Sequence, residues 1–152
     1  YYHFGIGKRP LPQKMFGIFP HRVQMPSHQL LRGFDEVYFA PHSRHTAICE
    51  EEILPGMGLE ILSRSEEAGS NILASQDGRQ FFVTSHSEYD RRTLAEEYFR
   101  DVEKGLPIEM PRGYFPGDNP EQDPPFIWRG HAHLLFSNWL NYYVYQQTPY
   151  EL

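Results

Sequence analysis

The chain has 152 residues and a formal net charge of −6 at pH 7, with 39% hydrophobic and 15% aromatic residues. This length suits one compact domain, and the apolar content is high enough to build a core, which argues against global disorder. The acidic charge argues against a general nucleic-acid-binding protein, because such proteins carry a basic surface. We therefore expect a single folded domain that binds no nucleic acid.

Cys49 is the only cysteine, so no disulfide can form within the chain, as is usual in the reducing cytoplasm. No apolar run reaches the length of a membrane span, and the first residues lack the apolar core of a signal peptide. These features predict a cytoplasmic protein without membrane contact. The chain opens at Tyr1 with neither an initiator methionine nor a helix-capping signal, and we expect it to be a fragment of a longer protein.

Short runs of apolar and β-branched residues predict strands at residues 15–19, 37–40, 59–62, 72–75 and 80–85. The dipeptide Asp77-Gly78 separates the last two runs. It is the strongest short-range hairpin signal in the chain, because both residues tolerate the left-handed backbone that a tight turn requires.

Two segments have the apolar spacing of helices. The first begins at a predicted cap, Asp90, and ends at Lys104-Gly105, with an apolar stripe formed by Leu94, Ala95, Tyr98, Phe99 and Val102. The second spans about residues 130–145, and its aromatic face predicts a core or dimer-interface helix rather than a base-stacking platform. Residues 105–127 hold six prolines and no predicted element. Strands with interspersed helices predict an α/β domain whose sheet, given the hairpin, is not purely parallel.

The clearest candidate for chemistry lies where the last predicted strand ends and the first helix begins. His86 and Glu88 stand two residues apart in this loop. A histidine there can act as a general base near neutral pH, and a carboxylate can orient its ring, as in catalytic triads. A surface loop with an acidic residue near a helix start explains the same pair, so the spacing by itself leaves both readings open.

Other potential ligands and nucleophiles favour structural roles. The histidine pairs His42/His45 and His131/His133 resemble zinc ligands, but no third ligand is evident, and we expect no metal. Cys49 precedes three glutamates, which raise the pKa of a thiol and disfavour a nucleophilic thiolate.

The whole pattern resembles the homoserine O-acyltransferase family, the homoserine O-succinyltransferases and O-acetyltransferases of methionine biosynthesis. The longest matching stretch, residues 134–146, reads Leu-Leu-Phe-Ser-Asn-Trp-Leu-Asn-Tyr-Tyr-Val-Tyr-Gln. The other matching stretches lie at residues 4–6, 14–17, 31–35, 40–44, 74–79, 82–90, 97–101, 114–116, 128–129 and 148–150. The resemblance covers essentially the whole chain and corresponds to the C-terminal half of such an enzyme.

The resemblance implies a flavodoxin-like, class I glutamine amidotransferase-like three-layer α/β fold and a Cys-His-Glu triad. In that family a thiolate takes an acyl group from acyl-CoA and passes it to the hydroxyl of L-homoserine, with no other cofactor. His86 and Glu88 match the family's histidine and glutamate, and Lys14, Ser43 and Arg100 match its substrate contacts. A guanidinium at Arg100 suits a carboxylate, which it can hold through two parallel hydrogen bonds.

Two departures from the family pattern matter. Ser87 stands between His86 and Glu88 where the family more often has proline. By the same resemblance, we expect the nucleophilic cysteine and the N-terminal half of the domain to lie upstream of Tyr1. The residue that distinguishes acetyl-CoA from succinyl-CoA lies in that half too; we favour acetyl, the broader activity in the family. A thiol-dependent amidotransferase-like enzyme and a non-catalytic module derived from such an enzyme are the alternatives.

Overall fold

The structure is a computed structural model that describes residues 2–148. Its centre is a five-stranded sheet in the order β2-β1-β3-β4-β5, with every neighbouring pair antiparallel. The strands are β1 (Lys8–Val23), β2 (Val37–Ile48), β3 (Leu59–Ser65), β4 (Gly69–Ser75) and β5 (Phe81–Val83). The helices are α1 (Thr93–Glu103) and α2 (Arg129–Trp139), with a π-helical segment at Leu140–Tyr145 and 3₁₀ turns at Gln29–Leu31, Glu50–Glu52 and Pro116–Asp118.

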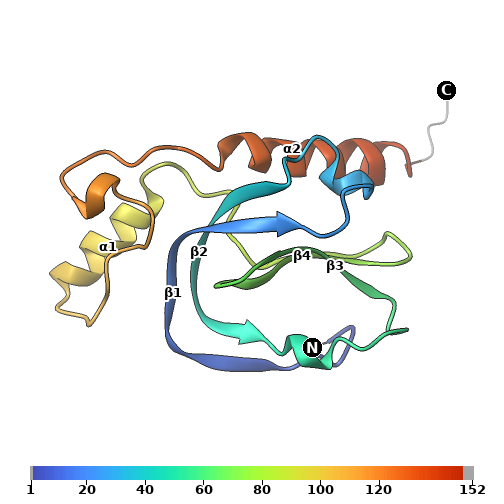
Figure 1. The fold of residues 1–152 in the computed structure, drawn as a ribbon, viewed down its shortest axis with the longest axis horizontal. Coiled ribbons are helices and arrows are strands. Elements are labelled where there is room, and N and C mark those ends of the chain that lie inside the picture. The colour runs from blue at the N-terminus through green and yellow to red at the C-terminus, as the bar shows by residue number, and fades with distance from the viewer. Residues whose placement is uncertain (1, 149–152) are drawn as a thin grey trace.

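The two longest strands, β1 and β2, bend together around the other three, with α1 beyond the bend and α2 along one side (Figure 1). They pair along almost their whole length, with a bulge between Pro10 and Met15. The strands predicted at residues 15–19 and 37–40 are therefore confirmed in position but were drawn too short. Pro41 directly follows the run at residues 37–40, yet it continues β2, because an edge strand needs no second partner for the missing N–H of proline.

The hairpin predicted at Asp77-Gly78 is confirmed and joins β4 to β5. Gly78 has φ +69°, and the Ser75 hydroxyl donates a hydrogen bond to Asp77 Oδ1 at 2.5 Å, which fixes the turn. The strands predicted at residues 59–62 and 72–75 extend to Leu59–Ser65 and Gly69–Ser75.

Both predicted helices are present with corrections. Asp90 is not the cap of α1, which begins at Thr93 without a side-chain cap and ends before Gly105 at φ +67°. The second helix becomes π-helical after Trp139 instead of continuing as an α-helix. Neither apolar face is fully covered within residues 2–148: the exposed large side chains are Phe99 and Val102 on α1 and Phe136 and Trp139 on α2.

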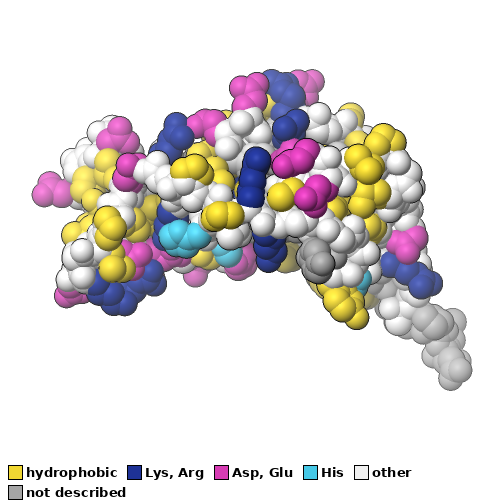
Figure 2. All heavy atoms as spheres, turned by 90° about the horizontal axis from the view of Figure 1, so that it is seen from below, with side chains coloured by type: hydrophobic (Ala, Val, Ile, Leu, Met, Phe, Trp, Pro, Cys, Tyr) yellow, Lys and Arg dark blue, Asp and Glu magenta, His cyan; other side chains and the backbone are white. Residues whose placement is uncertain are grey.

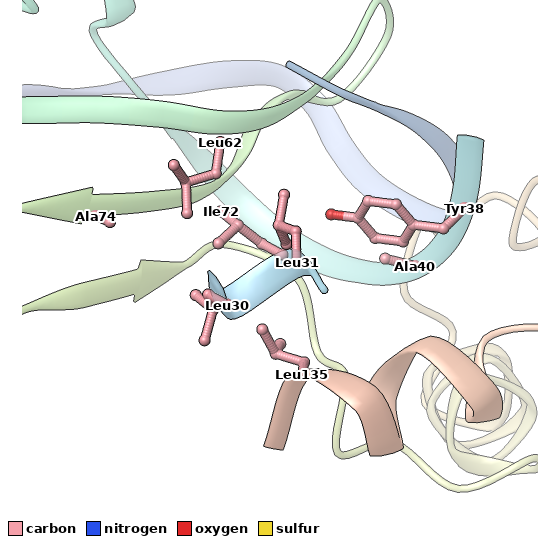
Figure 3. Close-up of a cluster of buried hydrophobic side chains, with 8 residues drawn as sticks. All are labelled: Leu30, Leu31, Tyr38, Ala40, Leu62, Ile72, Ala74 and Leu135. Carbon is pink, nitrogen blue, oxygen red and sulfur yellow. The ribbon is translucent and has the colours of Figure 1, made fainter. Parts of the chain in front are cut away.

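Buried apolar side chains form two clusters. The first joins the sheet to the turn Gln29–Leu31 and to α2 and contains Leu30, Leu31, Tyr38, Ala40, Leu62, Ile72, Ala74 and Leu135 (Figure 3). Asn138 of α2 reinforces this contact, because its amide donates to the carbonyl oxygens of Leu30 and Arg32 at 3.0 and 2.8 Å. The second cluster joins β1 to α1 and the proline-rich connection and contains Phe16, Ile18, Leu94, Ala95, Tyr114, Phe115 and Trp128.

The proline-rich connection packs on β1 at Gly17. Arg112 forms a parallel bridge with Gly17, and backbone hydrogen bonds run from Arg112 N to Phe16 O and from Ile18 N to Arg112 O, at 3.0 and 2.8 Å. A Cβ on Gly17 would lie 2.3 Å from the Arg112 carbonyl oxygen, so this close approach requires glycine. Leu94 and Ala95 of α1 pack in the same apolar cluster as Phe16 of β1, so α1 and the connection both lie against this part of β1.

The sheet of residues 2–148 contains no parallel strand pair, so these residues do not themselves form the parallel sheet of a flavodoxin-like fold. Within this part of the chain, no helix is both long and apolar enough to cross a membrane. The face opposite α2 mixes acidic, basic and apolar side chains, and the end that carries α1 shows several apolar ones (Figure 2). The exposed apolar residues of α1 belong to that end.

Candidate active site

The loop after β5 is fastened to the sheet at three successive residues. Thr84 N donates to Asn71 O at 2.9 Å, Ser85 N to Asn71 Oδ1 at 3.0 Å, and His86 N to Pro41 O at 2.8 Å. The Asn71 amide in turn donates to the buried Tyr38 hydroxyl at 2.8 Å. Because these anchors come from β4 and β2, the position of His86 is set by the sheet and not by the loop alone.

His86 and Glu88 contact each other as the triad prediction requires. His86 Nδ1 donates to Glu88 Oε1 at 2.8 Å. This hydrogen bond fixes the tautomer in which Nε2 carries the free lone pair, the form that accepts a proton as a general base. About a third of the His86 side chain is exposed to solvent, and the residue lines an open groove.

Lys14 and Ser43, predicted as substrate contacts, lie together around a residue that the sequence analysis did not single out, Glu97 of α1. Ser43 Oγ donates to Glu97 Oε2 at 2.6 Å, and Lys14 Nζ lies 3.3 Å from the same oxygen. Tyr89, three residues after His86, donates its hydroxyl proton to Glu97 Oε1 at 2.7 Å. The site therefore draws side chains from β1, β2, α1 and the loop after β5.

The Glu97 carboxylate is held in its ionised form. Burial by itself would raise its pKa, but hydrogen bonds from Ser43, Tyr89 and Lys14, together with the positive charge of Lys14, lower the pKa below its ordinary value. The Glu97 and Lys14 side chains are only 15% and 16% exposed. A buried carboxylate with three donors can still accept a further one, since its two oxygens offer about four lone-pair sites.

Arg100 lies one helical turn beyond Glu97, and its guanidinium pairs with a neighbour. Arg100 Nε donates to Asp101 Oδ1 at 2.8 Å, and this hydrogen bond and the nearby carboxylates raise the pKa of the guanidinium. Helical spacing would place Arg100 next to Glu96, four residues earlier, as the partner of a solvated ion pair. In the structure Arg100 forms its ion pair with Asp101 instead. The side chain is about half exposed.

The histidines that resembled zinc ligands have other partners. His42 is fully buried against His21, and His131 Nε2 lies 3.1 Å from Asp35 Oδ2. Among residues 2–148, no three histidine, cysteine, aspartate or glutamate side chains come together as a metal site. Cys49 follows the end of β2 among acidic residues, and partial burial together with Glu52 and Glu51 raises the pKa of its thiol. That direction disfavours a thiolate.

A groove of about 710 Å³ opens beside the His86–Glu88 pair. Its walls combine the edge strand β5 with exposed aromatic side chains of α2, and they include Phe82, Ser85, Leu135, Phe136 and Trp139. The groove therefore joins the His86–Glu88 pair to an open apolar surface.

The arrangement brings together a histidine with its carboxylate partner and, beside them, a polar cluster in which Lys14 pairs with Glu97 and Arg100 with Asp101. Two of its residues, Glu97 and Tyr89, were missed as site residues. A signal for Glu97 is present in the sequence, since it lies three residues after Leu94, on the buried face of a helix where an acid needs partners. Tyr89 offers no comparable signal, because an aromatic residue before a helix is ordinarily core.

The fold is similar to that of class I glutamine amidotransferases. A glutamine amidotransferase from Thermotoga maritima matches with a TM-score of 0.57 at 15% identity, over 90% of this chain and 54% of that chain. One from Methylobacillus flagellatus matches with a TM-score of 0.59 at 13% identity, over 90% of this chain and 56% of that chain. The described residues thus form part of a class I glutamine amidotransferase-like fold, as expected.

Sequence relatives identify the family within this class. The family model described as homoserine O-succinyltransferase matches residues 1–150. Homoserine O-acetyltransferases from Acetivibrio thermocellus and Brevibacillus brevis are 60% and 59% identical over 152 residues, all of this chain and 50% of each relative. The chain belongs to the homoserine O-succinyltransferase and O-acetyltransferase family, and it spans about half the length of the curated relatives it matches.

Proposed function

We propose that this chain supplies the base and acceptor-binding part of a homoserine O-acyltransferase of methionine biosynthesis. The observation that carries the proposal is the His86–Glu88 hydrogen bond beside the Lys14–Ser43–Glu97 cluster, in a chain that belongs to this family. Acetyl-CoA is the proposed donor, because relatives at 55–60% identity are named homoserine O-acetyltransferases. The acceptor is L-homoserine, and cytoplasmic action accords with the single cysteine.

In the proposed first half-reaction, His86 Nε2 takes the thiol proton of a cysteine outside this chain. The thiolate attacks the thioester carbonyl of acyl-CoA, an acyl–sulfur bond to the enzyme forms, and CoA leaves as a thiolate that takes the proton from His86. In the second half-reaction, His86 takes the hydroxyl proton of homoserine, whose oxygen attacks the acyl-enzyme. O-acylhomoserine leaves, and the cysteine recovers its proton. Glu88 stabilises the imidazolium at each stage.

The polar cluster suits an amino acid as acceptor. The Glu97 carboxylate is ionised and partly buried, which favours the ammonium group of homoserine. The Arg100 guanidinium lies one helical turn away with half of its surface exposed, which favours the carboxylate. Lys14 and Ser43 hold Glu97 in place from β1 and β2. The two charged groups of one amino acid would thus bind to successive turns of α1.

The remaining half of the domain, with the nucleophile, is proposed to pack on the open groove beside His86. β5 is an edge strand in the described sheet, and the adjoining Phe136 and Trp139 are 46% and 42% exposed. Unpaired strand edges and exposed aromatic side chains are features of surfaces that are covered in the complete protein. The cysteine would then reach His86 from the groove side.

The test is an acyl-transfer assay on the full-length protein. It measures CoA release with acetyl-CoA or succinyl-CoA in the presence and absence of homoserine. We expect release that depends on homoserine and is faster with acetyl-CoA. Homoserine-independent turnover of glutamine to glutamate and ammonia would support the amidotransferase alternative, and no turnover with any of these substrates would support the non-catalytic module.

A further inference from the structure

The side chain of Tyr89 contacts both the His86–Glu88 pair and the Lys14–Ser43–Glu97 cluster. Its ring stacks on the imidazole of His86, with centroids 4.4 Å apart and planes 15° from parallel. Its hydroxyl donates to Glu97 Oε1 at 2.7 Å. The ring thus stacks on the proposed base, and the hydroxyl holds Glu97, the carboxylate proposed to bind the ammonium group of homoserine.

The position of Tyr89 is fixed from several directions. Its backbone N–H donates to His86 O at 3.1 Å, and its carbonyl oxygen accepts a hydrogen bond from the indole N–H of buried Trp128 at 2.9 Å. The ring also packs against the apolar cluster of Phe16 and Leu94. A side chain held by its backbone, ring and hydroxyl has little freedom to move, so it can define the position of its neighbours.

The hydroxyl of Tyr89 remains a donor at physiological pH. Burial raises the pKa of the phenol, and its hydrogen bond to the Glu97 carboxylate raises it further. The phenol therefore stays protonated, and its contacts with Glu97 and His86 point to orientation as its contribution. On the ring side, parallel stacking limits rotation of the imidazole, while Glu88 fixes the same ring in its own plane through Nδ1.

We propose that Tyr89 is a positioning residue that couples the base to the acceptor site: its ring holds the plane of His86 and its hydroxyl holds Glu97. The distance between the proton-accepting nitrogen and the bound homoserine hydroxyl is then set by one rigid side chain. A small misplacement of reacting groups costs much of the rate, so such a frame favours the second half-reaction. This inference rests on the proposed function and assigns the contribution of one further residue to it.

Two variants separate the two contributions. Tyr89→Phe keeps the ring and removes the hydroxyl, so the KM for homoserine should rise about tenfold with a modest fall in kcat, while the acyl-CoA KM changes little. Tyr89→Leu removes both contacts, so kcat should fall well below that of Tyr89→Phe. Tyr98→Phe is the matched control: Tyr98 packs in the same cluster, its hydroxyl has no hydrogen bond to residues 2–148, and its kinetics should equal those of the parent.

NMR of the His86 ring protons provides a readout that does not depend on turnover. Stacking on a phenol ring shifts these protons, so Tyr89→Phe should keep their shifts and Tyr89→Leu should move them. Homoserine kinetics of Tyr89→Phe equal to those of Tyr98→Phe would overturn the hydroxyl's part, and unchanged His86 shifts in a folded Tyr89→Leu protein would overturn the ring's part. If the full-length parent protein transfers no acyl group, the proposed function fails, and so does the predicted effect of Tyr89 on the kinetics. The NMR result then still decides whether Tyr89 holds the His86 ring by stacking.

Discussion

His42 Nε2 lies 3.1 Å from His21 Nε2, and neither side chain is exposed to solvent. The hydrogen bonds define both tautomers: Arg44 Nε donates to His42 Nδ1, His42 Nε2 donates to His21 Nε2, and His21 Nδ1 donates to Phe19 O. This chain of donors has no place for an additional proton. Two neutral buried histidines therefore lie on β1 and β2, and one of them, His42, directly precedes Ser43.

The first prediction is that the folded protein loses stability below neutral pH. Burial and the charge of Arg44 lower the pKa of His21 from 6.5 to about 4, and burial with His21, Arg44 and His86 lowers that of His42 to about 2. The unfolded chain thus binds protons that the folded chain excludes, so stability is full above pH 6.5 and falls as the pH drops towards 4. His21 alone should contribute a loss of about 2 kcal/mol between pH 7 and pH 5.

Chemical unfolding at several pH values measures this loss. His42→Gln keeps a neutral hydrogen-bonding side chain and should flatten the dependence, whereas His45→Gln, at an exposed position of the same strand, should leave it unchanged. Equal slopes in the parent and in His42→Gln would show that the buried pair does not cause the acid sensitivity.

The second prediction concerns Glu97, the carboxylate proposed to bind the ammonium group of homoserine. Glu97→Gln keeps the shape and removes the charge, so the homoserine KM of the full-length enzyme should rise about 10- to 100-fold with little change in the acyl-CoA KM. Glu96→Gln changes the neighbouring, exposed carboxylate and serves as the control. If both variants bind homoserine equally well, Glu97 is a structural partner of Lys14 and Ser43 only.

The third prediction concerns the carboxylate of the acceptor. Arg100→Lys keeps the positive charge but removes the planar fork, so the homoserine KM should rise roughly tenfold while the acyl-CoA KM is unchanged. The control is Arg92→Lys, at the start of the same helix, where the guanidinium pairs with Asp123 at 2.6 Å. Unchanged homoserine kinetics in Arg100→Lys would restrict Arg100 to its ion pair with Asp101.

The fourth prediction concerns His86 and Glu88 as one unit. His86→Ala should nearly abolish turnover. Glu88→Gln should lower the turnover rate by about 10²–10⁴-fold, because Glu88 orients and stabilises the imidazole without carrying the proton. Adding Glu88→Gln to His86→Ala should then cost almost nothing more. A double variant much slower than His86→Ala would show that the two residues act separately.

Local signals in the sequence predicted the elements that depend on local contacts. Asp77-Gly78 marked a turn because its hydrogen bonds come from residues within the hairpin, and Gly105 marked the end of α1 because a left-handed residue ends a helix. The lengths of β1 and β2 were underestimated, since Pro12 lies at the bulge of β1 and Pro41 lies on the edge strand β2, and only the pairing partner shows that these prolines do not end the strands.

The site was predicted only where family resemblance or adjacency supported it. His86 and Glu88 are neighbours in sequence, so their contact could be anticipated. Glu97 lies 83 residues from Lys14 and 54 from Ser43, and the hydrogen bonds that join them arise when α1 packs against β1 and β2. No spacing rule reports a contact of that kind. The exposed apolar side chains of α1 and α2 could not be predicted either. Apolar spacing shows that a helix has an apolar face, but it does not show which part of the protein covers that face.

The central claim is that His86 and Glu88 serve a cysteine outside this chain. The most direct measurement is mass spectrometry of the full-length protein, quenched after mixing with acetyl-CoA and digested to locate the acyl group. The prediction is one acetyl group on a cysteine outside the 152 residues, formed slowly or not at all in His86→Ala and removed by homoserine. An acetyl group on Cys49 that homoserine removes, with turnover lost in Cys49→Ala, would contradict the claim.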